Sequence, residues 1–211
     1  MLDKVLVFDV DDTLYPYDVR RDQMEDILIN KYFQHKLNID EAKSAALIKV
    51  IRSKYHFDVD AMEKDFPFSK HDFMEQVCRV DMSFLQPNPE LDLLLKKLPQ
   101  RKIIFSDNIA NQIIDVLNLL KIDINNFSDI CDSHTMNYTF KYNSQAFEIF
   151  FSKYCLNPSD CIMFEDSIKN LDIAKKFGMT TVFISTQNDV NTDVFDYKFK
   201  DINTALKKLF F

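Results

Sequence analysis

Residues 5–15 of this chain read Val-Leu-Val-Phe-Asp-Val-Asp-Asp-Thr-Leu-Tyr, an apolar run that passes directly into three carboxylates. The apolar, β-branched run is typical of a strand buried inside a parallel sheet. In open sheets of that kind, ligands bind just outside the carboxyl ends of the strands. Asp9 and Asp11 are two positions apart, so both side chains can point to one side of the chain. The segment therefore predicts a functional site in which one carboxylate attacks, the other handles protons, and a hard cation offsets their repulsion.

Two other interpretations of the acidic segment need to be weighed. Asp-x-Asp-x-Thr also opens an EF-hand calcium loop, which requires Gly at its sixth position and Glu at its twelfth. Those positions hold Leu14 and Arg20, and this excludes the calcium loop. The second alternative is a solvated acidic turn at the end of a strand, which these residues alone do not exclude.

The bulk composition indicates a folded protein of moderate size. Its 211 residues can form one sizeable α/β domain with a smaller insertion, and a hydrophobic content of 46% is enough for a packed core. A net charge of −7 with scattered lysines argues against nucleic-acid binding. No apolar run approaches the ~18 residues that a transmembrane helix needs. Because a core strand begins almost at once, we also expect no secretory signal and no membrane partner.

The cysteines and the single glycine argue against two kinds of binding site. The four cysteines form no Cys-x-x-Cys pair and have no adjacent His. We therefore expect reduced thiols in a cytoplasmic protein rather than a zinc site. The single glycine excludes the glycine-rich phosphate loops of P-loop and dinucleotide-binding proteins. An anionic substrate would need positive charge from a metal ion or a positioned lysine.

A helical insertion follows the first strand. The strand pattern stops after Tyr15, and residues 16–86 show helical patterns without a strand candidate. Capping signals predict where these helices begin. We expect helices over 18–37, from Asn38 to about Lys54, and from Ser69 onward.

The alternation of strands and helices returns after residue 87. Asn88 followed by Pro89 predicts a helix start, and Gly178 is placed to end a later helix. We expect further strands at 102–105, 161–164, 180–184 and 196–199. The fold class is therefore α/β, with a parallel sheet in a core of residues 1–15 and 87–211 and a helical insertion of residues 16–86.

Polar side chains follow three of these expected strands. The pairs are Asp9/Asp11, Ser106/Asp107 and Glu165/Asp166, each after three or four consecutive apolar residues. Packing does not account for such pairs, because buried carboxylates are costly unless they are paired or bound to a metal. If the strands are neighbours, their carboxylates meet at one edge of the sheet. That oxygen-rich edge suits an octahedral cation, most simply Mg²⁺.

These motifs resemble a known family. The series Asp9-x-Asp11-x-Thr13, Ser106, Lys141 and Glu165-Asp166 is similar, in order and across essentially the whole chain, to the four motifs of the haloacid dehalogenase-like (HAD) phosphohydrolases. The resemblance implies a doubly wound, Rossmann-like core and identifies the helical insertion with the family's C1 cap. With an Asp at position 11 the chain resembles the phosphatase branches of the family, because true dehalogenases and P-type ATPases lack an Asp there.

A closer resemblance is to the pyrimidine 5′-nucleotidase branch. It rests on the ending Thr13-Leu14-Tyr15 and on Asp166-Ser167 followed by Lys169-Asn170. It implies a nucleoside 5′-monophosphate as the substrate. The first and last motifs are specific, whereas the two middle motifs are single residues.

The resemblance implies a role for each matching residue. Asp9 would attack phosphorus and form an aspartyl-phosphate, and Asp11 would protonate the leaving oxygen and then activate water. Lys141 would neutralise charge on the nucleophile and on the transferring group. Ser106 would donate its hydroxyl to a phosphate oxygen, and the backbone N–H of Asp107 would bind there too.

The same resemblance implies a magnesium site and its surroundings. The Asp9 carboxylate, the Asp11 backbone carbonyl and Asp166 would hold Mg²⁺, while Glu165 would act through water. Asn170 lies four residues after Asp166, so it could form a hydrogen bond behind the metal ligand.

Several positions depart from the family pattern or have simpler explanations. Asp107 stands where Asn is usual, so its carboxylate must point away from the phosphate. Tyr142 replaces the usual Pro, and aromatic residues at 55–68 replace a glycine-bearing cap loop. A lone Lys such as Lys141 is usually a solvated surface group. Ser106 could be an ordinary helix cap, a role compatible with phosphate binding.

The leading hypothesis is a Mg²⁺-dependent phosphomonoesterase that acts on a small phosphorylated metabolite as a monomer or homodimer. A phosphosugar mutase would use the same core chemistry. A non-catalytic binding or regulatory protein is the alternative from a different class, since a fold does not determine a function. The presence of Asp9, Asp11, Lys141 and Asp166 argues against a non-catalytic protein.

Overall fold

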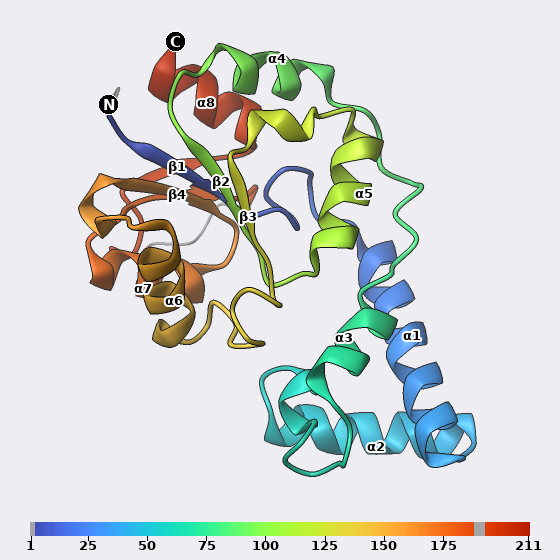
Figure 1. Ribbon diagram of the computed structural model, residues 1–211. Helices are drawn as coiled ribbons and strands as arrows, with labels where there is room; N and C mark the ends of the chain where they lie inside the picture. The colour runs from blue at the N-terminus through green and yellow to red at the C-terminus, as the bar shows by residue number, and fades with distance from the viewer. Residues whose placement is uncertain (1–2, 188–192) are drawn as a thin grey trace. The chain divides into compact units, whose positions relative to one another are not determined.

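The chain forms two compact units in a computed structural model that describes residues 3–187 and 193–211. One unit, here called the α/β unit, comprises residues 1–17 and 84–211. The other, the helical unit, comprises residues 18–83. Figure 1 shows the sheet in the first unit and only helices and loops in the second. Among the described residues, no helix is long and apolar enough to cross a membrane.

The α/β unit is built on a parallel sheet, as the sequence predicts. Its strands within the described residues are β1 (Val5–Phe8), β2 (Lys102–Phe105), β3 (Asp129–Cys131), β4 (Cys161–Glu165), β5 (Thr180–Ile184) and β6 (Tyr197–Phe199). Their order across the sheet is β3-β2-β1-β4-β5-β6, and every neighbouring pair is parallel. This is the order of a doubly wound Rossmann-like fold, which reverses direction between β1 and β4.

Helices cover both faces of this sheet (Figure 1). The helices of the α/β unit are α4 (Pro89–Lys97), α5 (Ala110–Leu120), α6 (Ser144–Tyr154), α7 (Ile168–Phe177) and α8 (Ile202–Phe210), with short 3-10 turns η2 (Ile124–Asn126) and η3 (Pro158–Asp160). Helices α6 and α7 lie on one face, and α4, α5 and α8 lie on the other. On the first face Phe105 packs against Phe147 and Phe150 of α6, with ring centroids 5.2 and 4.4 Å apart. Since both faces are buried, the strands need the unbroken apolar runs seen in the sequence.

One strand, β3, was not predicted from the sequence. It is only three residues long, and two of those residues are half-buried, so its sequence lacks a clear apolar run. It pairs with β2 at the edge of the sheet. Register with a neighbouring strand, rather than local pattern, makes this segment a strand.

The helical unit contains α1 (Val19–Leu37), α2 (Glu41–Lys54), the 3-10 turn η1 (Asp58–Ala61) and α3 (Lys70–Val77). Asn38 was wrongly expected to start the second helix. It instead ends α1 in the left-handed conformation with φ of 51°, and Asp40 caps α2 by accepting from the Lys43 N–H. Both Asn and Asp suit helix ends, so composition alone could not separate the two roles. Ser69 caps α3 as predicted.

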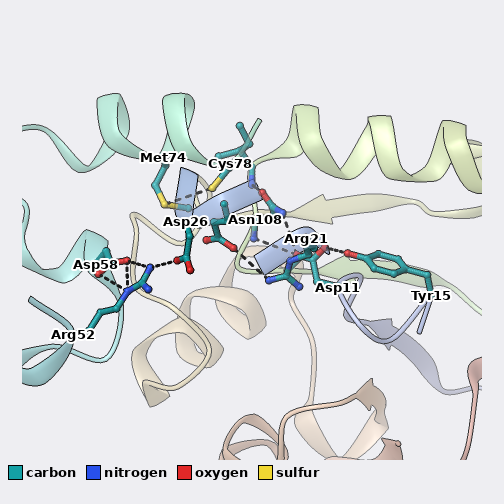
Figure 2. A network of polar contacts seen from close by, with 12 residues as sticks. Asp11, Tyr15, Arg21, Asp26, Arg52, Asp58, Met74, Cys78 and Asn108 are labelled. Carbon is teal, nitrogen blue, oxygen red and sulfur yellow. Dashed lines mark hydrogen bonds and ion pairs between the residues drawn. The ribbon is translucent and has the colours of Figure 1, made fainter. Parts of the chain in front are cut away.

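Aromatic packing and an ion-pair network around Arg52 hold the helical unit together. Phe66 and Phe68 stack on each other at 5.8 Å, and Phe66 also contacts the fully buried Phe33. The guanidinium of Arg52 lies 2.7 Å from Asp26 of α1 and 2.8 Å from the buried Asp58 of η1 (Figure 2). These contacts link α1, α2 and η1.

Candidate active site

Sheet topology brings the three polar strand ends to one edge. β1 lies between β2 and β4, with Phe8 level with Ile104 on one side and Phe164 on the other. The residues that follow these strands therefore emerge next to one another. The Asp9 N–H continues the ladder by donating to the Phe164 carbonyl at 3.0 Å. Asp9 and Glu165 thus lie at the topological switch point between β1 and β4, where doubly wound sheets bind their ligands.

Lys141 bridges two of these carboxylates. Its Nζ lies 2.5 Å from Asp9 Oδ1 and 2.8 Å from Glu165 Oε2. The lysine side chain is 2% exposed, and neither carboxylate exceeds 6%. The alternative of a solvated surface lysine is therefore wrong. A charge this deeply buried requires paired partners, and both oxygens of Glu165 are in fact occupied, since Oε1 accepts from the Ser167 N–H at 3.2 Å.

The loop that carries Lys141 is held by the end of β2. The Asp107 carboxylate accepts a hydrogen bond from the Lys141 N–H at 2.9 Å. The Lys141 ammonium also lies 5.7 Å from the centre of the Phe105 ring. The acidic side chain at position 107 therefore anchors the neighbouring loop. Asp107 stands where the family usually has Asn, and the hydrogen bond to the Lys141 N–H shows how the site accommodates the extra carboxylate.

Burial and mutual charge shift the pKa values of this cluster. Burial and the charge of Glu165 raise the pKa of Asp9 well above its ordinary value, although Lys141 acts in the opposite direction. Burial alone would lower the pKa of the Lys141 ammonium, but the charges of Asp9, Glu165 and Asp107 outweigh it and raise that pKa well above normal. Burial also raises the pKa of Asp107 to about 6. The site therefore holds more buried negative charge than one lysine can balance.

Asp9, Glu165 and Asp166 form a potential metal site. One carboxylate oxygen from each lies within 4.8 Å of the other two. Burial and the charges of Glu165 and Asp9 raise the pKa of Asp166 to about 9. An all-oxygen set of three carboxylates suits a hard divalent cation, which would relieve their repulsion. The donor set and the excess negative charge both fit Mg²⁺.

The carboxylate of Asp11 lies outside this metal cluster. It accepts from the Tyr15 hydroxyl at 2.6 Å and from the Asn108 side-chain amide at 3.1 Å (Figure 2). Sequence reasoning did not single out Asn108, and it used Tyr15 only as part of a motif. The available signal was the polar run Ser106-Asp107-Asn108 directly after a buried strand.

Ser106 and Asn170 are both buried. Ser106 Oγ accepts from the Asn108 N–H at 3.2 Å, which leaves the hydroxyl proton available for a ligand. Asn170 lies in the first turn of α7. The hydrogen bond that Asn170 is expected to form behind the metal ligand Asp166 stays a prediction.

Comparison with known proteins gives the family. A model of the haloacid dehalogenase-like hydrolase family matches residues 4–178, so this chain belongs to that family of hydrolases. No curated protein matches the chain in sequence.

Solved structures share its fold. The HAD phosphatase from Thermococcus onnurineus has a TM-score of 0.62 and 18% identity, over 97% of this chain and 96% of that chain. The putative HAD-hydrolase YfnB from Bacillus subtilis, bound to magnesium, has a TM-score of 0.62 and 14% identity, over 99% of both chains. The L-2-haloacid dehalogenase from Xanthobacter autotrophicus, with chloropropionic acid covalently bound, has a TM-score of 0.53 and 15% identity, over 88% of this chain and 79% of that chain. These identities are low, so the neighbours establish the fold and not the reaction.

Proposed function

We propose that the chain is a Mg²⁺-dependent phosphomonoesterase that acts on a small phosphorylated metabolite, with nucleoside 5′-monophosphates as the first substrates to test. The observation that carries the proposal is the arrangement around Asp9. Its carboxylate touches a buried ammonium at 2.5 Å, and two further carboxylates lie within 4.8 Å. A nucleophile surrounded by groups that bind phosphate oxygens and a hard cation suits phosphoryl transfer.

In the first half of the reaction, an Asp9 oxygen attacks phosphorus and the bond from phosphorus to the ester oxygen breaks. Asp11 donates a proton to the departing oxygen, which leaves as an alcohol. In the second half, Asp11 takes a proton from water as that water attacks the aspartyl-phosphate. Inorganic phosphate then leaves, and Asp9 is restored as a carboxylate.

Charge neutralisation keeps Asp9 reactive. Attack requires its ionised form, and burial opposes ionisation by raising the pKa. The Lys141 ammonium counters this effect at 2.5 Å. Lys141 and the Ser106 hydroxyl would also stabilise the charge that develops on the transferring phosphoryl group.

The metal would be held by Asp9, Asp166 and the Asp11 backbone carbonyl, with Glu165 behind them through water. When bound, it would supply electrostatic stabilisation of the phosphoryl oxygens. The cluster of oxygen ligands and the raised pKa of Asp166 support this assignment.

Asp11 favours phosphate hydrolysis over dehalogenation. An alkoxide leaving group needs a proton, whereas a halide ion leaves without one. A carboxylate held two residues after the nucleophile by Tyr15 and Asn108 can therefore protonate an alkoxide leaving group, a step that the departure of a halide does not need.

In this proposal the helical unit acts as the cap that selects the substrate. Phe66 and Phe68 pack against each other inside that unit, which disfavours them as a platform for a base.

A phosphate-release screen tests the proposal. Nucleotides, sugar phosphates and 4-nitrophenyl phosphate are assayed with Mg²⁺ and with EDTA, using wild type, Asp9→Asn and Asp11→Asn. Asp172→Asn, which alters an exposed carboxylate of α7, is the matched control. We expect activity that EDTA and both site variants abolish and that the control retains. Activity that survives EDTA, or full activity in Asp9→Asn, contradicts the mechanism.

Parallel assays separate the alternatives. Chloride release from 2-chloropropionate without phosphate release would indicate a dehalogenase. Bisphosphate-dependent isomerisation of a sugar phosphate would indicate a mutase. The absence of turnover in all three assays would favour a binding protein.

A further inference from the structure

Both oxygens of the Asp11 carboxylate are engaged by neighbours within the α/β unit. The Tyr15 hydroxyl donates to Oδ1 at 2.6 Å, and the Asn108 amide donates to Oδ2 at 3.1 Å (Figure 2). The two contacts come from different segments, one from the loop after β1 and one from the loop after β2. Together they determine the orientation of the carboxylate plane.

A further hydrogen bond sets the orientation of the Asn108 amide. Its Oδ1 accepts from the Ile109 N–H at 2.9 Å, so its NH₂ group must face Asp11. An NH₂ group can donate but cannot accept. The Asp11 oxygen opposite it is therefore restricted to the role of acceptor, and a proton held by Asp11 belongs on the other oxygen, Oδ1.

Tyr15 is suited to the oxygen that gains and loses the proton. A phenolic hydroxyl donates to the ionised carboxylate and, because it can rotate, does not oppose a proton on the same oxygen, so that proton can point to the leaving oxygen. The Tyr15 side chain is 4% exposed and lies four residues after Asp11, just beyond a turn closed by the Leu14 N–H and the Val10 carbonyl at 2.9 Å. The short turn and the burial hold the hydroxyl in place in both states.

We propose that Tyr15 and Asn108 are positioning residues that orient the Asp11 carboxylate for proton transfer to the leaving oxygen. The inference rests on the proposed function, because it assigns a role within that reaction. Neither residue touches the reacting atoms in this scheme. Asn108 confines the transferable proton to Oδ1, and the Tyr15 hydroxyl supports that oxygen whether or not the proton is present.

The test compares substrates whose leaving groups differ in their need for a proton. 4-Nitrophenolate leaves readily as an anion, whereas the more basic phenolate of phenyl phosphate depends on the general acid. The value of kcat/KM is measured for both substrates, with Mg²⁺, in wild type, Tyr15→Phe and Asn108→Ala. Tyr154→Phe is the matched control, because it removes a hydroxyl that donates to the Ile130 carbonyl within the same unit.

We expect Tyr15→Phe and Asn108→Ala to lower kcat/KM for phenyl phosphate by about 10-fold or more, since a general acid typically contributes ~10²–10⁴-fold. The loss on 4-nitrophenyl phosphate should be no more than about 2-fold for the same reason. Tyr154→Phe should affect the two substrates equally. Equal losses on both substrates in Tyr15→Phe would mean a merely structural role and would overturn the inference.

Crystal structures of wild type and Tyr15→Phe provide a readout that needs no activity. We expect the Asp11 side chain to change rotamer, or to occupy more than one, in the variant. An Asp11 side chain that stays in place overturns the positioning role. Wild-type protein that releases phosphate from neither aryl phosphate nor any nucleotide or sugar phosphate of the screen would refute the proposed function, and the crystallographic comparison would still decide whether Tyr15 orients Asp11.

Discussion

Replacing Lys141 by Met should destabilise the metal-free protein at pH 7. The lysine Nζ lies 2.5 Å from Asp9 and 2.8 Å from Glu165, and all three side chains are almost fully buried. Removing one partner of a buried ion pair leaves an unbalanced charge and costs about 3–5 kcal/mol of unfolding free energy. Met is close to Lys in length, so a cavity contributes little to this loss. The expected effect is thus electrostatic.

An electrostatic origin makes the loss depend on pH. Asp9 has a folded-state pKa above its unfolded value, so the folded protein binds its proton more readily than the unfolded chain does. Stability of the variant should therefore rise as pH falls toward the unfolded carboxylate pKa, because protonation removes the unbalanced charge. Lys141 has a raised pKa in the folded wild type. Its stabilisation is therefore fully present below the unfolded lysine pKa of about 10.4 and is lost as pH rises through the folded value.

Urea unfolding in EDTA at pH 5 and pH 7 measures this effect. Far-UV circular dichroism is the suitable signal, because the chain contains no tryptophan. Lys176→Met is the matched control, since its side chain is 71% exposed and pairs with Asp172 at the surface. Such a surface pair is worth at most about 1 kcal/mol.

A double variant separates charge from packing. Adding Glu165→Gln to Lys141→Met removes one unbalanced carboxylate and should recover part of the lost stability. The reasoning is refuted by a loss below about 1 kcal/mol, the size of a surface ion pair. A loss that is equal at pH 5 and pH 7 would also refute it, because packing defects do not titrate.

Three further predictions concern other parts of the α/β unit, each measured by urea unfolding. Burial raises the Asp107 pKa to about 6, so this carboxyl lowers the stability of the wild type as pH rises from 4 to about 6. Asp107→Asn should therefore flatten that decline and raise stability at pH 7 in EDTA. An unchanged pH profile would contradict this. Mg²⁺ at ~100 times its Kd should stabilise wild type by about 2.7 kcal/mol but not Asp166→Asn. Equal stabilisation of both proteins would exclude Asp166 as a ligand. Gly178→Ala should cost about 1–2 kcal/mol from backbone strain alone, since φ is 93° and an added Cβ would meet nothing within 4 Å; a neutral result would count against strain.

Strong local patterns were sufficient to predict much of the fold. The strands at 102–105 and 180–184 were predicted at their observed bounds, and Gly178 ends α7 in the left-handed conformation as expected. Buried parallel strands demand continuous apolar runs, which makes them visible in a single sequence. The short edge strand β3 carried no such run and was missed.

Side-chain partners at the site were less predictable. The polar character of residues 106–108 was evident, but the partners of Asp107 and Asn108 were not. One accepts from the backbone of Lys141, 34 positions away, and the other donates to Asp11, 97 positions away. Such contacts depend on loop geometry, which short motifs do not encode.

The residues of the opening segment determine, by themselves, that a buried strand ends in carboxylates, and hence that chemistry is expected at the end of β1. Tertiary structure alone decides what those carboxylates face. The strand order places β1 beside both β2 and β4, which surrounds Asp9 with Lys141, Glu165 and Asp166 and directs Asp11 to Tyr15 and Asn108. The physical reason is that local sequence sets which groups are polar or buried, whereas burial energy and charge compensation depend on neighbours that only the folded sheet brings together.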